Sequence, residues 1–330
     1  MQTFRQRNSS GFTIVEMLVV IGIIVILIGL LLPALSGVQA RGKKLSEGND
    51  LRQIGSAWSM YANLNNSAVL PGYIEPAVQE RWRTQFEYPM QLDPNDPQSL
   101  IIEPEVAAAW TWRLLPLLDY NAELVRGYTG EPLGTPNALM VDPEDPDRPL
   151  TVALEPAFGY NAFYVGGWLD VETVTADEGS VESVRARYWQ ARDAETNERV
   201  NVIARTMSQI RRPSELVIFS SASRFETPSA YGRILDDIHG SHLVTPTRLA
   251  ESDQWQMASS QFEGAGADDP YAIQTLASPA HAPIGRYNRA VAYLRADGSH
   301  DAQPVQSLLS QRKWIDAATR DDFTHTEGGE

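Results

Sequence analysis

The feature that most constrains this chain of 330 residues is a long apolar run near its N-terminus. From Phe12 to Leu32 there are 21 residues, and only Thr13 and Glu16 among them are polar. A helix rises about 1.5 Å per residue, so a run of this length matches the roughly 30 Å hydrocarbon core of a bilayer. The sequence therefore predicts a membrane-spanning helix, followed by a chain long enough to form a large domain with its own core.

Glu16 is the one charged residue in this run. A charge near the middle of a bilayer costs about 2.5–3.5 kcal/mol on insertion scales, so a carboxylate in such a run indicates a function. The alternative is an ordinary signal peptide or signal anchor, in which Glu16 lies shallow enough to reach the headgroups. A secretory signal has a shorter apolar core that precedes a small-residue cleavage site, whereas here the small residue, Gly11, comes before the run.

The segment from Gly11 to Glu16, followed by the long apolar run, resembles the N-terminal signature of type IV pilins and type II secretion pseudopilins. The resemblance implies that a prepilin peptidase cuts between Gly11 and Phe12 and that Phe12 becomes the N-methylated terminus. It also implies that Glu16 is the assembly carboxylate, which pairs with the terminal amine of a neighbouring subunit. Pro33 stands where such proteins often have a proline, at the exit from the membrane, and a kink in the helix is expected there.

The positive charges beside the apolar run do not fix its orientation by themselves. Arg5 and Arg7 precede the run, while Arg41, Lys43 and Lys44 follow it. The family resemblance implies a single-pass protein of the bacterial inner membrane, with the leader cytoplasmic and the head periplasmic. The protein is then expected in a pilus or pseudopilus or at the cell surface.

Four segments follow from this interpretation. Residues 1–11 are the prepilin leader, 12–35 the transmembrane and assembly helix, 36–64 its continuation into the head, and 65–330 the periplasmic or extracellular pilin-like head. In the continuation, large side chains recur at steps of three or four residues. They are Leu51, Ile54, Trp58, Tyr61 and either Leu64 or Asn65. One face of this helical segment is therefore expected to pack on the head.

The part of the chain after residue 35 is strongly acidic. The whole chain carries 27 Lys and Arg against 42 Asp and Glu, a net charge of −15, while residues 1–35 contain only Arg5, Arg7 and Glu16. The remainder therefore has a net charge of −16. Nucleic acids and anionic lipid headgroups favour basic surfaces, so neither is expected as a partner. The chain has no cysteine, which excludes disulfides, thiolate metal sites and thiol nucleophiles.

Further passages resemble a subset of large pilin-like proteins of the planctomycete type. They are residues 51–63 with the following Leu70-Pro71-Gly72, the aromatic-Gly-Tyr-Asn element at 158–163, the Pro-Ser element at 210–219 and Asp297-Gly298 near the C-terminus. That subset usually has a histidine ten residues before the Asp, where this chain has Tyr287, and His281 lies further upstream. This departure removes the basis for transferring a role to that histidine.

The expected fold class is α+β, in which the long N-terminal transmembrane and assembly helix packs on an antiparallel β-sheet head, as in pilins. Short apolar runs at 216–220 and 290–294 predict two strands, and Asp297-Gly298 supplies the turn after the second. A final amphipathic helix is predicted over residues 305–318. Its apolar residues are Leu308, Leu309, Trp314 and Ile315.

Several polar stretches are expected on the surface of the head. Residues 170–201 and 252–270 are predicted to be surface insertions. A proline-rich loop concentrates carboxylates that would suit Ca²⁺, namely Asp142, Glu144, Asp145 and Asp147. The loop lacks the glycine and the trailing glutamate of an EF-hand, and its prolines restrict wrapping around an ion, so a solvated turn is the favoured interpretation. No cofactor is expected, and Ca²⁺ stays an alternative.

The usual catalytic patterns are absent from the sequence, including a nucleophile elbow, H-E-x-x-H, a P-loop and G-x-G-x-x-G. His239 and His242 follow Asp236 and Asp237, but a polar loop explains this weak cluster better than a metal site does. Ser220-Ser221 is interpreted as a strand-end turn and not as a nucleophile, because no base is placed beside it. Core packing is favoured over a carbohydrate or partner surface for most tryptophans of the head. These are Trp82, Trp110, Trp112, Trp168, Trp189 and Trp255.

The sequence therefore favours a structural subunit and not an enzyme. The predicted function is that of a pilin-like protein, processed by prepilin peptidase and assembled with other pilin or pseudopilin subunits into a type IV pilus or a type II secretion pseudopilus. The alternative is a membrane-anchored or filament-tip protein that uses a pilin-type signal and binds a ligand or adheres through its head. The head is large for a repeating major subunit, which favours a minor or specialised role.

Overall fold

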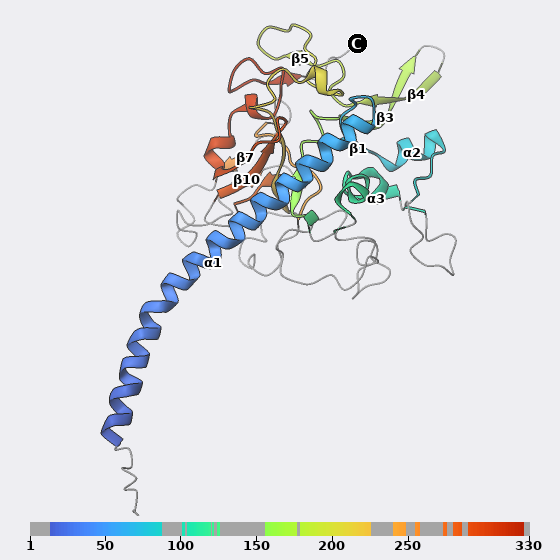
Figure 1. Cartoon of the computed structure of the whole chain (residues 1–330). Coiled ribbons are helices and arrows are strands. Elements are labelled where there is room, and N and C mark those ends of the chain that lie inside the picture. Colours follow the sequence, from blue (N-terminus) through green and yellow to red (C-terminus); the bar gives the residue numbers. More distant parts are fainter. Residues whose placement is uncertain are drawn as a thin grey trace, which may run out of the picture. The chain divides into compact units, whose positions relative to one another are not determined.

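The fold is taken from a computed structural model (Figure 1). The described residues are 14–87, 101–102, 104–119, 121, 124–125, 156–176, 179–225, 240–248, 255–257, 273–275, 280–285 and 290–326. The chain divides into two compact units, Met1–Lys43 and Lys44–Glu330. Each unit is described by itself.

The longest element is the helix α1, Ile14–Leu64, which has 51 residues and contributes to both units. It ends at Leu64, one of the two residues at which the spacing of large side chains stops. The end has a local cause, because Asn66 and Ser67 have φ angles of 53° and 66°, in the left-handed region that cannot continue a right-handed helix. The Ser67 N–H donates to the Ala62 carbonyl at 2.8 Å and so satisfies one of the last carbonyls of the helix.

The second unit is built on a five-stranded antiparallel sheet of order β11-β10-β6-β2, with β9 also paired to β6. Its strands are β2 (Phe158–Tyr160), β6 (Val217–Phe225), β9 (Ala280–Pro283), β10 (Ala290–Arg295) and β11 (His300–Pro304). The two strands predicted from sequence are the first half of β6 and most of β10. Asp297 and Gly298 lie in the reversal between β10 and β11, and Gly298 has a φ of 81°, which glycine adopts without strain.

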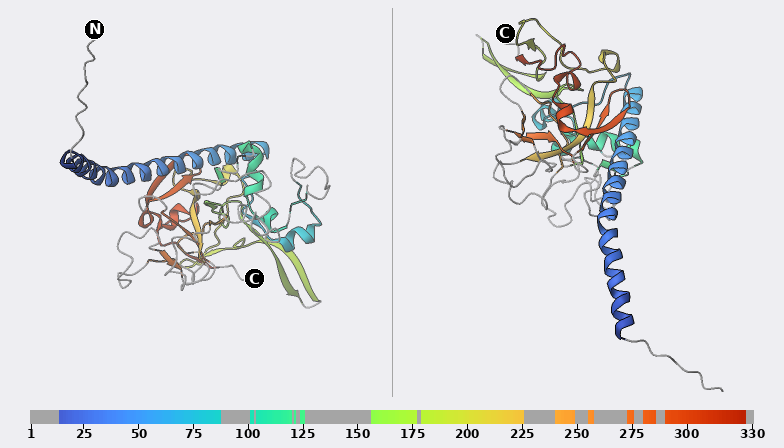
Figure 2. Two further views of the ribbon diagram at one scale, coloured as in Figure 1. Left: turned by 90° about the horizontal axis from the view of Figure 1, so that it is seen from below. Right: turned by 90° about the vertical axis from the view of Figure 1, so that its left-hand side faces the viewer.

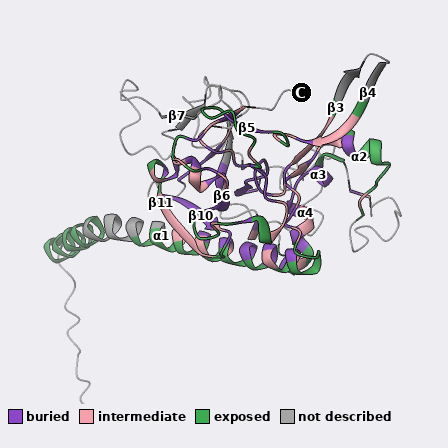
Figure 3. Cartoon of the chain, turned by 90° about the horizontal axis from the view of Figure 1, so that it is seen from above, coloured by how far each residue is buried: buried purple, intermediate pink, exposed green. Residues whose placement is uncertain are grey.

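The part of α1 that belongs to the second unit packs on this sheet (Figures 1 and 2). Leu51, Ile54 and Trp58 are fully buried in one cluster with side chains of β6 and β10. Tyr61 is half-buried and packs against the same cluster, whereas Leu64 is 69% exposed, so the apolar face ends before Leu64. Figure 3 shows buried positions along the side of this helical segment that faces the strands and exposed positions on its other side.

The aromatic-Gly-Tyr-Asn element forms β2 and the residue that follows it. Its Gly, Tyr and Asn each make a specific packing or hydrogen-bond contact. Gly159 lies against the backbone of Leu243, where a Cβ would overlap the Leu243 carbonyl. The amide of Asn161 donates to the carbonyls of Val217 and Trp314, at 3.0 and 2.8 Å. This element therefore joins β6 and the C-terminal segment.

The Tyr160 hydroxyl links α1 to the loop that follows it. It accepts a hydrogen bond from Trp58 Nε1 at 3.3 Å and donates to the Leu70 carbonyl at 2.9 Å. All three residues are fully buried, and burial raises the pKa of Tyr160 far above its usual value. The hydroxyl therefore stays protonated and can donate at any physiological pH.

The predicted C-terminal α-helix over 305–318 is wrong. The segment forms two short 3₁₀ turns, η6 (Val305–Leu308) and η7 (Gln311–Lys313). Between them Ser310 is extended, with φ −68° and ψ 124°, and the Gln311 N–H donates to the Asp321 carbonyl instead of continuing a helix. The apolar residues still face the core, where Leu308, Trp314 and Ile315 are fully buried against the second face of the sheet.

The expected surface insertion at 170–201 contains strands that the sequence interpretation did not assign, because its first half is a long β-hairpin. β3 (Trp168–Ala176) pairs antiparallel with β4 (Gly179–Ala186), and β1 (Tyr73–Ile74) adds a parallel strand to β3. The register places Val171 opposite Val184 and Asp170 opposite Arg185. Near the start of the hairpin an apolar pair and a charged pair therefore lie on opposite faces of the sheet.

Short elements complete the described structure. The helices are α2 (Pro76–Trp82), α3 (Pro104–Ala108) and α4 (Thr111–Leu114), with the 3₁₀ turns η2 (Leu115–Leu118) and η4 (Met207–Gln209). The strands are β5 (Arg192–Asp193), paired with β12 (His325–Thr326), and β7 (Trp255–Met257), paired with β8 (Ile273–Thr275). Of the predicted insertion at 252–270, the described residues are those of β7. The fold class is α+β with largely antiparallel sheets, as the sequence predicts.

Candidate assembly surface

The first unit presents the largest exposed apolar surface of the described residues. Every large apolar side chain from Ile14 to Ile28 is between 46% and 81% exposed. These residues are nearly consecutive, so they cover all sides of α1 and not a single stripe. A helix that is apolar on every side requires lipid or other helices around it. Among the described residues, no helix meets the combined length and hydropathy of a membrane span.

Glu16 lies in the first turn of α1 and is exposed. The N-terminus of a helix carries a partial positive charge and unsatisfied N–H groups, and both favour a carboxylate at this position. The proposed cleavage pair, Gly11 and Phe12, lies outside the described residues. Pro33 lies within α1, which continues through it.

Asp297 and Gly298 are exposed, and Asp297 closes the turn between β10 and β11. Asp297 Oδ1 accepts from the Ser299 N–H at 2.9 Å and from the Ser299 hydroxyl at 2.6 Å, which closes the turn. The Asp297 N–H donates to the Pro213 carbonyl at 3.0 Å. The turn is therefore hydrogen-bonded to the segment that precedes β6. This contact links the Asp-Gly and Pro-Ser passages in one fold.

No group of three or more possible metal ligands occurs among the described residues. The candidate Ca²⁺ ligands lie outside the described residues; they are Asp142, Glu144, Asp145 and Asp147. His239, Asp236 and Asp237 also lie outside them. His242 stacks on Tyr73 with ring centroids 5.6 Å apart, and its ring lies 6.0 Å from that of His281.

Ser220 and Ser221 lie within β6 and not in a strand-end turn, which corrects the interpretation from sequence. Both are fully buried. The Ser221 hydroxyl donates to the Ala292 carbonyl at 3.2 Å and accepts from the Ala292 N–H at 3.0 Å, so it replaces a backbone pair between β6 and β10. The Ser220 hydroxyl donates to the Ser221 carbonyl at 3.0 Å. Both hydroxyls therefore form hydrogen bonds within the central sheet.

The tryptophans divide between core and surface. Trp110 is fully buried and donates through Nε1 to the His242 carbonyl at 2.9 Å. Trp112 and Trp168 are partly buried. Trp82 and Trp189 are 46% and 47% exposed, so core packing does not account for them. The side chain of Trp255 is not among those that the structure describes.

The comparison with protein families finds a match at the start of the chain. A model of the prokaryotic N-terminal methylation motif matches residues 6–32. The chain carries the type IV pilin and pseudopilin signature. No curated protein and no solved structure matches the chain.

The pilin signature begins before α1 and extends through its exposed apolar part. A pilin-type signal implies processing by a prepilin peptidase and assembly with other pilins. It also implies a protein that is first anchored in a membrane and then exposed at the surface. The signature thus suggests a structural subunit, and it accounts for an apolar helix surface that the described chain leaves uncovered.

Proposed function

We propose that this protein is a pilin-like structural subunit that assembles into a type IV pilus or a type II secretion pseudopilus. In this proposal residues 1–11 are a cytoplasmic leader, 12–35 cross the inner membrane once, 36–64 continue the helix into the head, and 65–330 form a periplasmic or extracellular head. Prepilin peptidase cuts between Gly11 and Phe12 and N-methylates Phe12. The partners are the peptidase and other pilin-type subunits.

The observation that carries the proposal is the methylation motif at the start of a helix that is apolar on every side. At about 1.5 Å per residue, the 51 residues of α1 extend for about 77 Å. Such a helix is longer than the roughly 30 Å bilayer core requires, and its C-terminal part is already packed in the head. The exposed part is therefore available first to lipid and then to the helices of neighbouring subunits.

In the proposed mechanism Glu16 sets the position of each subunit along the filament. After cleavage Phe12 carries a terminal amine, and Glu16 is the fifth residue of the mature chain. An isolated carboxylate in an apolar surrounding is costly, and so is an isolated ammonium group, whereas a pair formed between neighbouring subunits neutralises both. The pairing is satisfied at only one axial offset, so it selects the register of assembly.

The packing of α1 on the head keeps the head attached to the filament core. Leu51, Ile54 and Trp58 bury one face of the helix, and the Trp58 to Tyr160 hydrogen bond fixes its rotation. Lys44 Nζ also donates to the Ala302 carbonyl of β11 at 3.4 Å. A force on the helix is thereby transmitted to the central sheet, as a filament subunit requires.

The test is the fate of Glu16→Ala in cells that assemble the filament. We expect normal insertion and cleavage, because neither needs the carboxylate, and at least a tenfold loss of the protein from sheared filaments, because the buried amine has no partner. Asp50→Ala is the matched control, since Asp50 is a partly exposed acid of the same helix and lies outside the motif. Filaments that contain Glu16→Ala at the level of the control would overturn the mechanism.

A further inference from the structure

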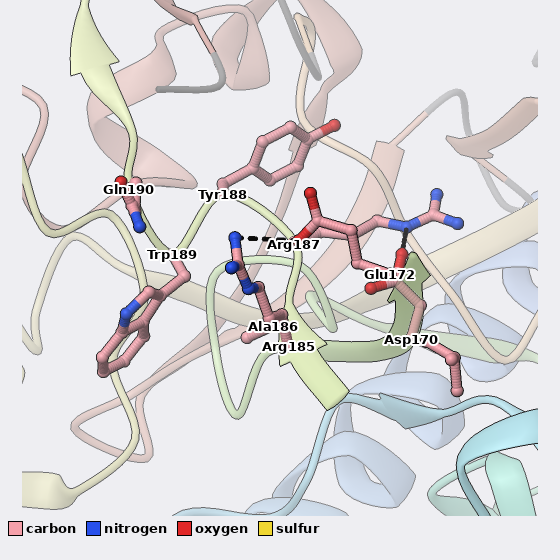
Figure 4. Close-up of a pocket in the computed structure, with 9 residues that line it drawn as sticks. Asp170, Glu172, Arg185, Ala186, Arg187, Tyr188, Trp189 and Gln190 are labelled. Atoms are coloured by element: carbon pink, nitrogen blue, oxygen red, sulfur yellow. Dashed lines mark hydrogen bonds and ion pairs between the residues drawn. The ribbon is translucent and has the colours of Figure 1, made fainter. Parts of the chain in front are cut away.

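The head contains a cavity that the assembly helix does not use. It lies along β3, β4 and the turn that follows β4, and has a volume of about 360 Å³ (Figure 4). Small-molecule sites range over roughly 300–1,000 Å³, so the cavity suits a compact ligand. All of its lining residues belong to the second unit.

The charges that line the cavity are balanced. Two carboxylates, Asp170 and Glu172, face two guanidinium groups, Arg185 and Arg187. Arg185 pairs with Glu172 at 3.0 Å and Arg187 with Asp170 at 2.7 Å, and Figure 4 shows both ion pairs. Arg187 also reaches Glu75 at 3.1 Å, just outside the lining. An ionic ligand would have to break one of these pairs, whereas an uncharged ligand would not.

These side chains are nevertheless open to a polar ligand. The side chains of Arg185 and Glu172 are 37% and 50% exposed, and that of Arg187 is 40% exposed. Guanidinium N–H groups and carboxylate oxygens alternate along the wall, so it offers donors and acceptors next to one another. Hydroxyl groups both donate and accept, and a ligand with several adjacent hydroxyls would match such a wall.

Trp189 adds an apolar surface at the end of the cavity. Its indole is 47% exposed, and the guanidinium of Arg205 lies 4.4 Å from its ring centroid. This contact holds the ring in place, so binding against its free surface costs little side-chain entropy. Figure 4 shows the Trp189 and Tyr188 rings pointing away from each other.

The backbone at Tyr188 accounts for this arrangement. Tyr188 has a φ of 59°, in the left-handed region that a bulky residue rarely adopts. Its ring stacks on Tyr164, with centroids 6.0 Å apart, and meets the edge of His325 at 4.6 Å. The strained turn packs the partly buried Tyr188 against the core and leaves its neighbour Trp189 at the surface. Such strain is often kept at binding sites.

We propose that this cavity binds a neutral saccharide, with the apolar C–H face of one sugar ring against Trp189 and its hydroxyls bonded to Glu172, Arg185 and Asp170. A planar indole beside paired donors and acceptors, without net charge in the lining, matches a sugar better than an ion or an apolar molecule. A peptide that extends the edge strand β4 is the competing occupant. It would pair with the β4 backbone, which ends at Ala186, and would not require Trp189.

The test uses the full chain in dodecyldimethylamine oxide micelles, because this detergent has no sugar headgroup. The protein is first applied to an array of neutral and charged glycans, and neutral trisaccharides that bind are then titrated by calorimetry. We expect saturable binding of at least one neutral saccharide, and at least tenfold weaker binding by Trp189→Ala. Trp82→Ala is the matched control, since Trp82 is 46% exposed and lies outside the cavity, and its affinity should stay within twofold.

Glu172→Gln gives a second test that does not depend on the folding of Trp189→Ala. It keeps the size of the side chain but removes the ion pair with Arg185, so affinity should fall about three- to tenfold while the circular dichroism spectrum stays unchanged. The proposal is overturned if the folded protein binds no neutral glycan of the array. It is also overturned if only charged glycans or peptides bind, or if Trp189→Ala binds as tightly as Trp82→Ala.

Discussion

Replacing Tyr160 by Phe should weaken the packing of α1 on the head and lower the free energy of unfolding. The change removes one oxygen, which accepts from Trp58 Nε1 at 3.3 Å and donates to the Leu70 carbonyl at 2.9 Å. Both partners are fully buried, so water cannot replace the hydroxyl without rearrangement. A buried polar group left without a partner costs about 1–3 kcal/mol, and two such groups give a loss of about 2–6 kcal/mol in the free energy of unfolding.

The assay is urea unfolding of the full chain in micelles at pH 7, followed by near-ultraviolet circular dichroism. Tyr61→Phe is the matched control, because Tyr61 is a half-buried tyrosine of α1 for whose hydroxyl the described residues provide no hydrogen-bond partner. That control should change the free energy of unfolding by less than about 0.5 kcal/mol. If Tyr160→Phe costs no more than Tyr61→Phe, the hydrogen-bond relay does not hold the helix and the reasoning is refuted.

Two further predictions concern the head. Burial lowers the pKa of His325 from 6.5 to about 4. Below pH 6.5 the unfolded chain therefore binds this proton before the folded chain does, and the free energy of unfolding falls by about 1.4 kcal/mol per pH unit. The total loss is about 3 kcal/mol near pH 4. His325→Gln should remove this part of the pH dependence in urea unfolding at pH 7 and pH 4.5, and equal slopes in both proteins would contradict the assignment. Gly159→Ala should cost more than about 3 kcal/mol or prevent folding, because its Cβ would overlap the Leu243 carbonyl. Gly42→Ala, with open space around it, should be neutral or slightly stabilising in the same urea unfolding assay, and equal effects of both changes would refute the packing argument.

Features that depend on neighbouring residues in the chain could be predicted from sequence. The recurrence of Leu51, Ile54 and Trp58 reports one face of a helix, and the same three residues are buried in the structure. The end of the helix at Leu64 follows from the residues after it. The apolar runs of β6 and β10 are equally local signals, and so is the glycine turn that follows β10.

The sequence prediction is wrong for the C-terminal segment, where distant contacts set the backbone, and it leaves the β3–β4 hairpin unassigned. Leu308, Trp314 and Ile315 have helical spacing, but the spacing records burial, and the backbone between them is bent by contacts with Asp321. The polar composition of β3 and β4 suggests an insertion, although Leu169 and Val171 alternate with Asp170 and Glu172 as in a strand. That alternation is the signal that could have revealed the hairpin.

The candidate sites differ in the same way. The motif around Glu16 is continuous in sequence, so the residue types alone identify it. The cavity beside Trp189 depends on the register that places Asp170 opposite Arg185, and on a left-handed turn at Tyr188. Neither the register nor the turn is visible in the residue types, so in the sequence Trp189 is only one tryptophan among several.

The measurement that tests the central claim most directly is the mass of the N-terminal peptide of the protein isolated from its native membrane. The account predicts a chain that begins at Phe12, with the leader of residues 1–11 removed and one methyl group on the terminal amine. A chain that keeps Met1, or one cut after Leu32, would contradict it. In either case the motif at residues 6–32 would not act as a prepilin signal in this protein.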